Sequence, residues 1–575
     1  MSLVRLVRVL DGLTLVFLAL LAGVLLTGGW TVPLGSWPLP ITRPENVLLA
    51  TLPVLALRWW LCPPALPAIP PRRALALGVA GYTVVFSFIT VSRHYAFGTH
   101  ALDLGYYVQV LSNIAHGQGA YVSLPEMHAW GDHFSPILYL FVPLLVIFPG
   151  AVSLLVAQSV IFAWGAVAVF AIATRRLANG TLAAAFAGLY LLNPSLHGVN
   201  LRDFHPAALS IPLLLWAMAS FEANRPFWLL TAVLLTLGTR EDAALAVIGL
   251  GLWIALGRRR WSWGIGLTVL GFGWLFLTTG WVMPHFRGVP YPHLQRFAHL
   301  GGSMSEILLT LAIHPFQALS FLVSGDRLKY LVALVAPLGF LPLLSPLDLL
   351  PALPTIVVNL ESRDPVLFHH RAQYTAFILP FLVAAAISGC RRLARWTSGA
   401  TGESGFRFRP RGVMAVAVLV SLALTSRTVN DLGVNKWRLS DRQRIAYSVM
   451  ARIPPNAAVS TWERFVPHMA LRPKVFIFPV GLGQSDYVLL DLTAYSRRGP
   501  PDITLDRRGD AVVLKSGGLE YRYEVVTDEA QYLLLRRVPT ESRRGEIFRQ
   551  GRCLAREDVG RRPPLQRPPG RRQAG

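Results

Sequence analysis

The chain has 575 residues, of which 53% are hydrophobic and only 15% are charged. Soluble globular proteins carry about 25% charged residues, so this composition excludes an ordinary soluble protein and indicates a polytopic membrane protein. The net charge of +23 does not indicate nucleic-acid binding, because the arginines fall in short loops and in the tail instead of on one basic face. Three cysteines without CxxC spacing give neither a disulfide framework nor a cysteine metal site.

Apolar runs recur from the N-terminus to residue 427, and most approach the length that crosses a bilayer. The first is too long for a signal peptide and lacks a clear cleavage site, so we interpret it as a span. Two short runs, 135–149 and 347–359, are predicted to be interfacial or re-entrant helices. The sequence predicts about thirteen crossings: 12–32, 46–62, 74–92, 152–173, 182–194, 206–222, 226–239, 242–256, 262–283, 307–324, 328–345, 373–389 and 412–427.

Arginine placement predicts the orientation, because cytoplasmic loops of membrane proteins are enriched in Arg and Lys. With the N-terminus in the cytoplasm, the arginine clusters before residue 396 all face the same side, among them Arg72–Arg73, Arg175–Arg176, Arg258–Arg260 and Arg391–Arg395. Most of the 14 histidines then fall in outward loops. The sequence therefore predicts a polar site on the extracytoplasmic face.

The fold class predicted is an all-α polytopic membrane protein with a small C-terminal α/β domain. Residues 428–540 carry the pattern of that domain, with a helix near 441–452 followed by short strand-like runs, and the odd number of crossings places them outside. The tail is rich in Arg and Pro and is predicted to be disordered. The predicted segments are 1–73 (N-terminal membrane helices), 74–427 (membrane core, with a long outer loop at 93–134), 428–540 and 541–575.

The first outer loop contains candidate catalytic and metal-binding residues. Asp103, in "HALDLGYY", follows the third apolar run, and an ionisable group at a membrane boundary is costly to hold and marks a functional candidate. Alternatively, Asp103 is a solvated loop residue or the N-cap of a helix starting at Leu104. In "WGDHFSPI", Asp132 and His133 are adjacent. They are candidate ligands for a metal or a pyrophosphate-linked cation, or they simply end the loop.

A second candidate group is "NLRDFHPAALSIP", where Arg202, Asp203 and His205 precede an apolar run. In an extended backbone Asp203 and His205 would face the same way, and Arg202 could hold a phosphate oxygen bidentately. The alternative is an Asp that caps a helix with a proline in its first turn.

Two further charged segments extend the candidate site. Arg240, Glu241 and Asp242, in "LGTREDAALAV", lie between short apolar runs and are interpreted as a polar cavity wall or as an internally neutralised ion pair at a tight turn. The loop "ESRDPVLFHHRAQYTAF" suits phosphate and hydroxyl recognition, or an ordinary membrane interface. Its residues chosen for testing are His370, Arg371 and Tyr374.

Taken in order, five motifs resemble a family of bacterial multi-pass membrane proteins whose function is unknown: "LDLGYYVQ", "GDHFSPILYLFVPL", "RDFHPAAL", "TREDAAL" and "HHRAQYTAFILP". That family shows FDLG-, HFSP-, DFHP- and KED-type motifs. Here Leu102 replaces the usual Phe and Arg240 the usual Lys. The resemblance covers roughly residues 74–540 and implies location in the bacterial inner (cytoplasmic) membrane, with the lipid bilayer as a partner.

The layout also resembles the GT-C superfamily of membrane glycosyltransferases, with a long first outer loop and an acidic residue just past a span. This resemblance implies transfer of a sugar from a polyprenyl-phosphate donor to an extracytoplasmic envelope acceptor. GT-C loops often carry an Asp-Glu pair, whereas Leu104 follows Asp103 here, and two extra spans precede the first GT-C-like helix.

Under this hypothesis Asp103 is the general base that deprotonates the acceptor hydroxyl. Arg202, Arg240 or Arg371 balances charge on the departing phosphate, and Gln109, His370 and Tyr374 are further substrate-binding candidates. Carboxylates and imidazoles could also hold Mg²⁺ or Mn²⁺; the candidate ligands are Asp132, His133, Asp203, His205, Glu241 and Asp242.

Two non-enzymatic functions remain as alternatives. A transporter or flippase for an envelope precursor would need polar groups leading to the cytoplasmic side, and inverted repeats would favour it. A non-catalytic envelope assembly protein would tolerate Asp103→Ala but not deletion of residues 440–540.

Overall fold

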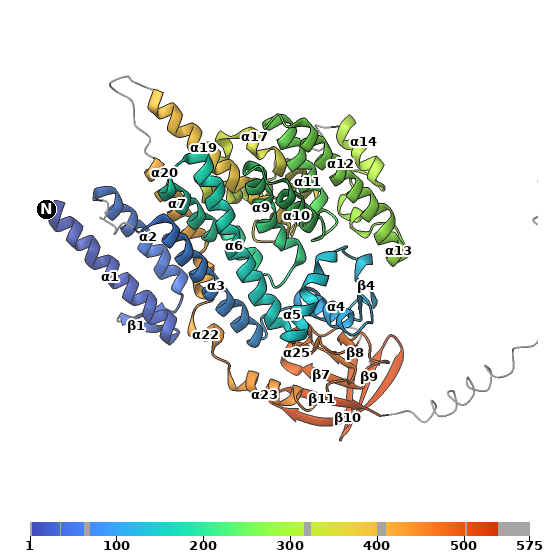
Figure 1. The fold of residues 1–575 in the computed structure, drawn as a ribbon. Helices are drawn as coiled ribbons and strands as arrows, with labels where there is room; N and C mark the ends of the chain where they lie inside the picture. Colours follow the sequence, from blue (N-terminus) through green and yellow to red (C-terminus); the bar gives the residue numbers. More distant parts are fainter. Residues whose placement is uncertain are drawn as a thin grey trace, which may run out of the picture. The chain divides into compact units, whose positions relative to one another are not determined.

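The computed structural model describes residues 3–34, 36–62, 69–314, 324–399, 410–500 and 503–538. The chain divides into two compact units, Met1–Ser485 and Asp486–Gly575 (Figure 1). The first is mostly helical and the second contains an antiparallel sheet. The tail predicted at 541–575 and part of the predicted span 307–324 lie outside the described residues. The domain boundaries drawn from the sequence stay a prediction.

Within the described residues, four helical segments are long and apolar enough to cross a membrane. A bent pair, α7 with α8, would make a fifth. The segments are α1 (Leu3–Thr27), α3 (Pro71–Tyr95), α6 (Ala151–Leu177) and Trp261–Arg287, which joins α12 (Trp261–Leu277) to α13 (Met283–Arg287); the bent pair is α7 (Gly180–Leu191) and α8 (Pro194–Asn200).

The prediction of about thirteen crossings is therefore not confirmed. Several of the predicted spans form apolar helices of 10–17 residues, whereas a straight helix that crosses the apolar core of a bilayer needs about 20 residues. These include α9 (Ser210–Glu222), α10 (Pro226–Leu237), α11 (Ala243–Leu252) and α20 (Pro410–Leu424).

The remaining helices of the first unit are mostly short. The two runs predicted not to cross form α5 (Val142–Ile147), and α17 (Pro346–Leu349) with α18 (Leu353–Glu361). Other helices are α2 (Pro44–Leu61), α4 (Tyr106–Ala115), α14 (Met304–Ile313), α16 (Gly325–Val335), α19 (Leu379–Gly399), α21 (Ser426–Asn430), α22 (Val434–Trp437), α23 (Asp441–Met450) and α24 (Val466–Met469).

Helix α6 lies at the centre of the helical unit, where it packs against α3, α7, α9 and α19 (Figure 1). Small residues allow this close packing. A Cβ at Gly165 would lie 2.3 Å from the hydroxyl oxygen of Tyr190, and this hydroxyl donates a hydrogen bond to the carbonyl of Phe162 at 2.9 Å. Because α6 contacts so many neighbours, polar side chains near its two ends are held by a fixed frame.

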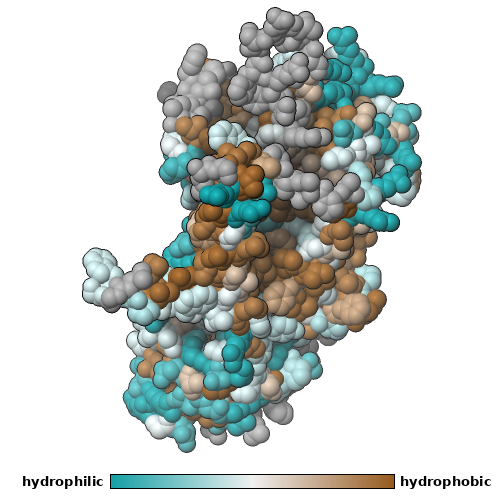
Figure 2. Space-filling view, turned by 90° about the vertical axis from the view of Figure 1, so that its left-hand side faces the viewer, coloured by the Kyte–Doolittle hydropathy of each residue, from teal (hydrophilic) through white to brown (hydrophobic). Residues whose placement is uncertain are grey.

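The outer surface of the helical unit is apolar, as expected of a protein that contacts lipid. Val84, Trp164, Val269 and Phe276 are each more than half exposed. Figure 2 shows exposed hydrophobic residues gathered in a band across the visible face, with hydrophilic residues above it. Exposed apolar surface of this extent is unusual for a soluble monomer and fits insertion in a bilayer.

Short strands complete the two units. The first unit contains the pairs β1 (Trp30–Leu34) with β2 (Trp37–Ile41), β3 (Tyr121–Val122) with β4 (Met127–His128), and β5 (Val459–Thr461) with β6 (Val475–Ile477). In the second unit, antiparallel pairing gives the order β7-β11-β10-β9-β8, from β7 (Tyr487–Asp491), β8 (Ile503–Arg508), β9 (Ala511–Ser516), β10 (Leu519–Glu529) and β11 (Tyr532–Arg537). The polar strand β8 was not predicted. Asp491 caps the N-terminus of α25 (Leu492–Arg498), where its side chain accepts hydrogen bonds from the N–H groups of Thr493 and Ala494.

Candidate active site

Two loops far apart in the chain meet at one end of α6 and join their acidic and imidazole side chains. Nε2 of His205 lies 3.0 Å from Oδ1 of Asp103. The backbone N–H and Nδ1 of His100 lie 2.9 and 3.1 Å from Oδ2 of Asp203. We name these four residues the Asp103 cluster. The sequence predicted three of them as site residues, and the structure brings those three together.

The turn that carries Asp203 and His205 is held by Gln158, a fully buried residue of α6. Nε2 of Gln158 donates to the carbonyl of Asp203 at 2.9 Å, and its Oε1 accepts from the N–H of His205 at 3.0 Å. Asp203 has a φ of +71°, which is uncommon for a residue other than glycine. Two hydrogen bonds from one rigid helix therefore fix this backbone, and Asp203 does not cap the helix that follows.

Asp103 is the accessible carboxylate of the cluster. Its side chain is 38% exposed, whereas those of Asp203 and His205 are 3% and 6% exposed. It lies inside a π-helical turn, Ala101–Gly105, so it is not the N-cap that the sequence left open as an alternative. Burial acts to raise the pKa of Asp103, but the charge and hydrogen bond of His205, together with His100 and Arg202, hold that pKa below its ordinary value. Asp103 is therefore an anion at neutral pH.

A cavity of about 470 Å³ opens beside Asp103. Its wall contains three arginines, Arg93, Arg202 and Arg371, with His369 and Asp431. Guanidinium groups are the usual partners of phosphate oxygens. We name this space the Asp103 cavity. It combines the ionised carboxylate of Asp103 with the guanidinium groups of three arginines, which suits a substrate that carries both a hydroxyl and a phosphate.

Close approach of the loop with Arg371 depends on a glycine. A Cβ at Gly198 would lie 2.2 Å from the Cβ of Arg371, so a larger residue would displace the loop that holds the guanidinium. Burial lowers the pKa of Arg371, Asp431 acts to raise it, and the positive charges of Arg427 and Arg93 lower it. Mutual repulsion among cations in a cavity is relieved by a bound anion.

A second polar cluster forms around the buried carboxylate of Glu241, which is 1% exposed. Oε1 of Glu241 lies 2.9 Å from Nδ1 of His133 and accepts a hydrogen bond from the Tyr291 hydroxyl at 3.2 Å. Its Oε2 accepts from the N–H of Phe134 at 3.2 Å. The ring of His133 stacks on His293 with 4.6 Å between centroids. A buried carboxylate is costly unless paired and hydrogen-bonded, and Glu241 has three such partners.

Three residues of this second cluster could hold a metal ion. Asp132, His133 and His293 each present one ligand atom, and these atoms lie within 4.8 Å of one another. Because Nδ1 of His133 faces Glu241, its Nε2 is left for a metal, the arrangement in which a carboxylate orients a metal-binding histidine. Burial and the charge of His133 lower the pKa of His293 to about 4. Against its burial, the charge and hydrogen bond of Glu241 raise the pKa of His133 above its ordinary value, so a metal ion bound here would have to displace a proton from Nε2 of His133.

An apolar cavity of about 800 Å³ lies next to the second cluster. Tyr291, His293 and Arg296 are among the polar residues of its wall, and most of the wall is apolar, with Phe272, Phe276, Leu311, Val357 and Phe377. The loop before α19 separates it from the Asp103 cavity: Val366 and Gln373 line the Asp103 cavity, while Leu367 and Tyr374 line the apolar one. The two cavities therefore share a wall.

Arg240 and Asp242 need a correction as substrate and metal contacts. Nε and Nη2 of Arg240 bind the two carboxylate oxygens of Asp242 at 2.6 and 2.5 Å. The buried guanidinium also lies 4.9 Å from the ring centre of Tyr374. This is the internally neutralised turn that the sequence left open, so Arg240 is not a free cation for phosphate. Glu241 lies between these two residues in the chain, and its side chain belongs to the second cluster.

Gln109 and His370 also need correction as substrate contacts. Gln109 is fully buried, and its amide is bonded to the Ser123 hydroxyl at 2.8 Å and to the Ser123 N–H at 2.9 Å. It fastens the loop that follows α4 and has no free group for a ligand. His370 does not line the Asp103 cavity; the adjacent His369 does.

Sequence reasoning missed Gln158, His100, Tyr291 and His293 as site residues. The signal for Gln158 was a single amide in an otherwise apolar helix, which also occurs in helix cores without function. His100, Tyr291 and His293 lay in loops predicted to face outward, but nothing in the sequence indicated their partners.

Comparison with known proteins gives a family and distant structural likenesses. The family model described as predicted membrane protein (DUF2079) matches residues 93–524. The chain is similar to ArnT from Cupriavidus metallidurans bound to undecaprenyl phosphate, at 16% identity and a TM-score of 0.48, covering 81% of this chain and 98% of that one. The apo form of that protein gives 15% identity, the same coverage and a TM-score of 0.46.

A further likeness is to the Archaeoglobus fulgidus oligosaccharyltransferase in complex with Zn and sulfate. Here the identity is 11% and the TM-score 0.41, over 72% of this chain and 68% of that one. A search of curated protein sequences found no match.

Proposed function

The chain belongs to the DUF2079 family of predicted membrane proteins, and from this premise we propose that it is an integral-membrane glycosyltransferase. It moves a sugar from a polyprenyl-phosphate donor to an acceptor on the extracytoplasmic side of the bacterial inner membrane. The observation that carries the proposal is that Asp103, held as an anion by His205, shares one cavity with Arg93, Arg202 and Arg371.

The chemistry follows from these groups. Asp103 accepts the proton of an acceptor hydroxyl as the hydroxyl oxygen forms its bond to the anomeric carbon of the sugar. The bond between that carbon and the phosphate oxygen breaks, and the phosphate leaves with the electron pair. Arg202 and Arg371 stabilise the negative charge that develops on the departing phosphate. The sugar moves between two oxygens, so no oxidant or reductant takes part.

The apolar cavity supports a donor that carries a lipid chain. A polyprenyl tail gains free energy when it leaves water for an apolar groove, while its phosphate needs cationic or hydrogen-bonding groups. The cavity of about 800 Å³ has a mostly apolar wall to which Tyr291, His293 and Arg296 add polar groups. Its shared wall with the Asp103 cavity brings a bound donor next to the ionised carboxylate.

Asp132, His133 and His293 would hold a divalent cation, and two imidazoles in the ligand set favour Mn²⁺ over Mg²⁺. The ion would supply positive charge near a donor phosphate. Asp203, which the sequence also offered as a ligand, lies with His100 and Asp103 in a second group whose ligand atoms are within 4.8 Å of one another and which could also hold a cation. His205, the other candidate of that loop, is bonded to Asp103 and positions its carboxylate.

The test is an analysis of lipids and envelope glycans in cells that carry Asp103→Asn. We expect transfer to fall about 10²- to 10⁴-fold, the usual contribution of a general base, with accumulation of a polyprenyl-phosphate sugar or of a glycan that lacks one sugar. The matched control is Asp326→Asn, because Asp326 is an exposed carboxylate far from either cluster in the chain.

Three outcomes separate the alternatives. An unchanged envelope with normal amounts of the Asp103→Asn protein would contradict the transferase. Donor moved across the membrane without cleavage would indicate a flippase. An assembly protein would show the defect only when residues 440–540 are deleted.

A further inference from the structure

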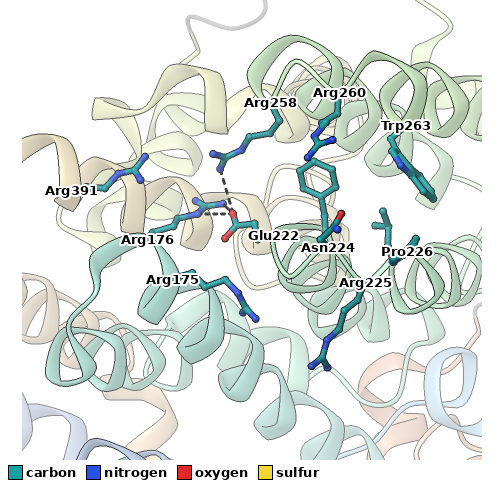
Figure 3. A pocket seen from close by; sticks show the side chains of 12 residues that line it. Arg175, Arg176, Glu222, Asn224, Arg225, Pro226, Arg258, Arg260, Trp263 and Arg391 are labelled. Carbon is teal, nitrogen blue, oxygen red and sulfur yellow. Dashed lines mark hydrogen bonds and ion pairs between the residues drawn. The ribbon is translucent and has the colours of Figure 1, made fainter.

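An arginine-rich pocket lies between helix ends of the first unit, apart from both polar clusters. Its volume is about 490 Å³. Six arginines line it, and they come from α6, from the turn before α10, from the loop before α12 and from α19: Arg175, Arg176, Arg225, Arg258, Arg260 and Arg391. Figure 3 shows Arg176 of α6, Arg258 of the loop before α12 and Arg391 of α19 pointing toward one another. We name this space the arginine pocket.

The charges of the arginine pocket are not balanced. Arg176 and Arg258 both bind one carboxylate of its wall, Glu222, with Nη2 of each at 2.5 and 3.3 Å from Oε1 (Figure 3). Arg258 also lies 3.5 Å from Asp348. Two carboxylates thus face six guanidinium groups, and in the described part of the chain no ion-pair partner reaches Arg225, Arg260 or Arg391.

Buried polar atoms in the same pocket lack partners. Nε of Arg258 and Nε of Arg391 are shielded from solvent and have no hydrogen-bond partner among the described residues. Burial lowers the pKa of Arg258, and the positive charge of Arg176 lowers it further. Unpaired guanidinium N–H groups that repel one another are an expensive arrangement, which an anion would relieve.

The arginine pocket lies at the opposite end of the membrane helices from the Asp103 cluster. On α6, Gln158 holds the cluster and Arg176 lines the pocket. The 18 residues between them rise about 27 Å along a helix, close to the apolar thickness of a bilayer. Helix α9, with the 3₁₀ turn Pro206–Leu209 that precedes it, begins next to His205 and ends at Glu222, which lines the pocket.

The rim of the arginine pocket carries aromatic side chains that favour a membrane interface. Trp263 lines the pocket, and Trp228 and Trp261, next to lining residues in the chain, are more than half exposed. Tryptophan gathers where the bilayer meets water, at the depth of lipid headgroups. An anion in this pocket therefore lies at headgroup level.

We propose that the arginine pocket binds a phosphate group at the membrane face opposite the Asp103 cluster. The phosphate belongs either to the headgroup of an anionic lipid or to a free phosphate compound, and basic pockets between membrane helices recognise such groups. Bidentate guanidinium contacts supply the recognition. This site does not depend on glycosyl transfer and would exist in any of the alternative functions.

The experiment uses the purified full chain and two phosphate probes. In the first arm, native mass spectrometry measures retention of phosphatidylglycerol or cardiolipin. In the second, isothermal titration measures binding of inorganic pyrophosphate to the chain in phosphatidylcholine nanodiscs. Each arm compares three proteins: the wild type, the double variant Arg260→Gln/Arg391→Gln and the control Arg72→Gln/Arg73→Gln. Neither substitution of the pocket variant removes an ion pair of the described residues.

The control arginines carry the same charge and lie in the first turn of α3. That turn lies beside the end of α6, because the ring of Pro71 is 3.1 Å from a Cβ built at Gly180, three residues after α6 ends. They do not line the pocket. We expect the pocket variant to bind about tenfold more weakly than the wild type and the control to match the wild type. Because the Asp103 cavity also contains arginines, only the difference between these two variants reports on the pocket.

If the pocket variant binds only the lipid more weakly than the wild type does, the ligand of the pocket is a lipid headgroup. If it binds pyrophosphate more weakly, the ligand is a free phosphate compound. Both results support phosphate recognition. The proposal is overturned when neither probe binds, or when the pocket variant and the control bind equally. Melting temperatures of both variants in phosphatidylcholine nanodiscs show that loss of binding is not loss of the fold.

Discussion

Nε2 of His205 lies 3.0 Å from Oδ1 of Asp103, although 102 positions separate the two residues. Nδ1 of His205 is buried and has no hydrogen-bond partner among the described residues, so Nε2 makes the polar contact of the ring. The relationship implies that His205 sets the ionisation of Asp103 and does not itself meet the substrate.

His205→Ala should therefore move the acid limb of the pH profile for transfer to higher pH. Burial raises the pKa of Asp103 and His205 opposes this, so without His205 the carboxylate becomes protonated at higher pH and ceases to act as a base. The measurement is the transfer rate against pH in membranes. His205→Asn keeps an N–H donor, so its acid limb should lie between those of the wild type and of His205→Ala. An unmoved acid limb would contradict this role.

Gln158→Met should lower kcat by about 100-fold, because a small displacement of catalytic groups has such an effect. The substitution keeps the side-chain length but removes both hydrogen bonds to the turn of Asp203 and His205. The matched control is Gln109→Met, at a second fully buried glutamine with no place in either cavity. Both variants should lose about 1–3 kcal/mol of stability, and equal kcat values would show that Gln158 has no positioning role.

His293→Ala should weaken Mn²⁺ binding by at least about tenfold, measured by titration of the purified chain with electron paramagnetic resonance detection of free Mn²⁺. His293 supplies one of the three converging ligand atoms. The control His285→Ala removes an exposed imidazole of the same region that stacks on Trp281. Equal Mn²⁺ affinity of both variants, or no saturable binding by the wild type, would refute the metal site.

His468→Phe should reduce the loss of thermal stability on acidification. The ring of His468 stacks on His94 at 4.0 Å, and burial, with the charge of His94, lowers the pKa of His468 to about 2. An unfolded histidine takes up a proton near pH 6.5, whereas the folded one stays neutral, so this stability is present above pH 6.5 and is lost as the pH falls below it. Melting temperatures between pH 7.5 and 5 test this; parallel curves for wild type and variant would contradict it.

The sequence singled out residues that the structure brings into the two clusters, because ionisable residues stand out in an apolar chain. Asp103, Asp203 and Glu241 were chosen on that ground, and each lies in one of the two clusters. The sequence could not predict which of these residues would contact one another. Glu241 meets His133 at a separation of 108 positions, and no local pattern indicates which histidine a buried carboxylate will find.

The predicted number of crossings is not confirmed, because hydropathy counts apolar residues, whatever the length of the helix that contains them. Helices α10 and α11 have 12 and 10 residues, and their composition resembles that of a span. The prediction of Gln109 as a substrate contact needed correction for a related reason. The sequence of a motif does not distinguish a polar residue that contacts a ligand from one that holds a neighbouring loop. Burial, which only the fold defines, separates these cases.

The course of α6 has a consequence for the host membrane. The Asp103 cavity near Gln158 and the arginine pocket near Arg176 need water or headgroups at opposite ends of a span whose length the helix rise fixes. A bilayer with longer acyl chains would draw one of these polar ends into hydrocarbon, and the helices would have to tilt or the lipid to thin around them. The chain is therefore matched to membranes of one thickness. The acyl-chain length of the lipids then determines whether the Asp103 cavity and the arginine pocket can both reach water or headgroups at the same time.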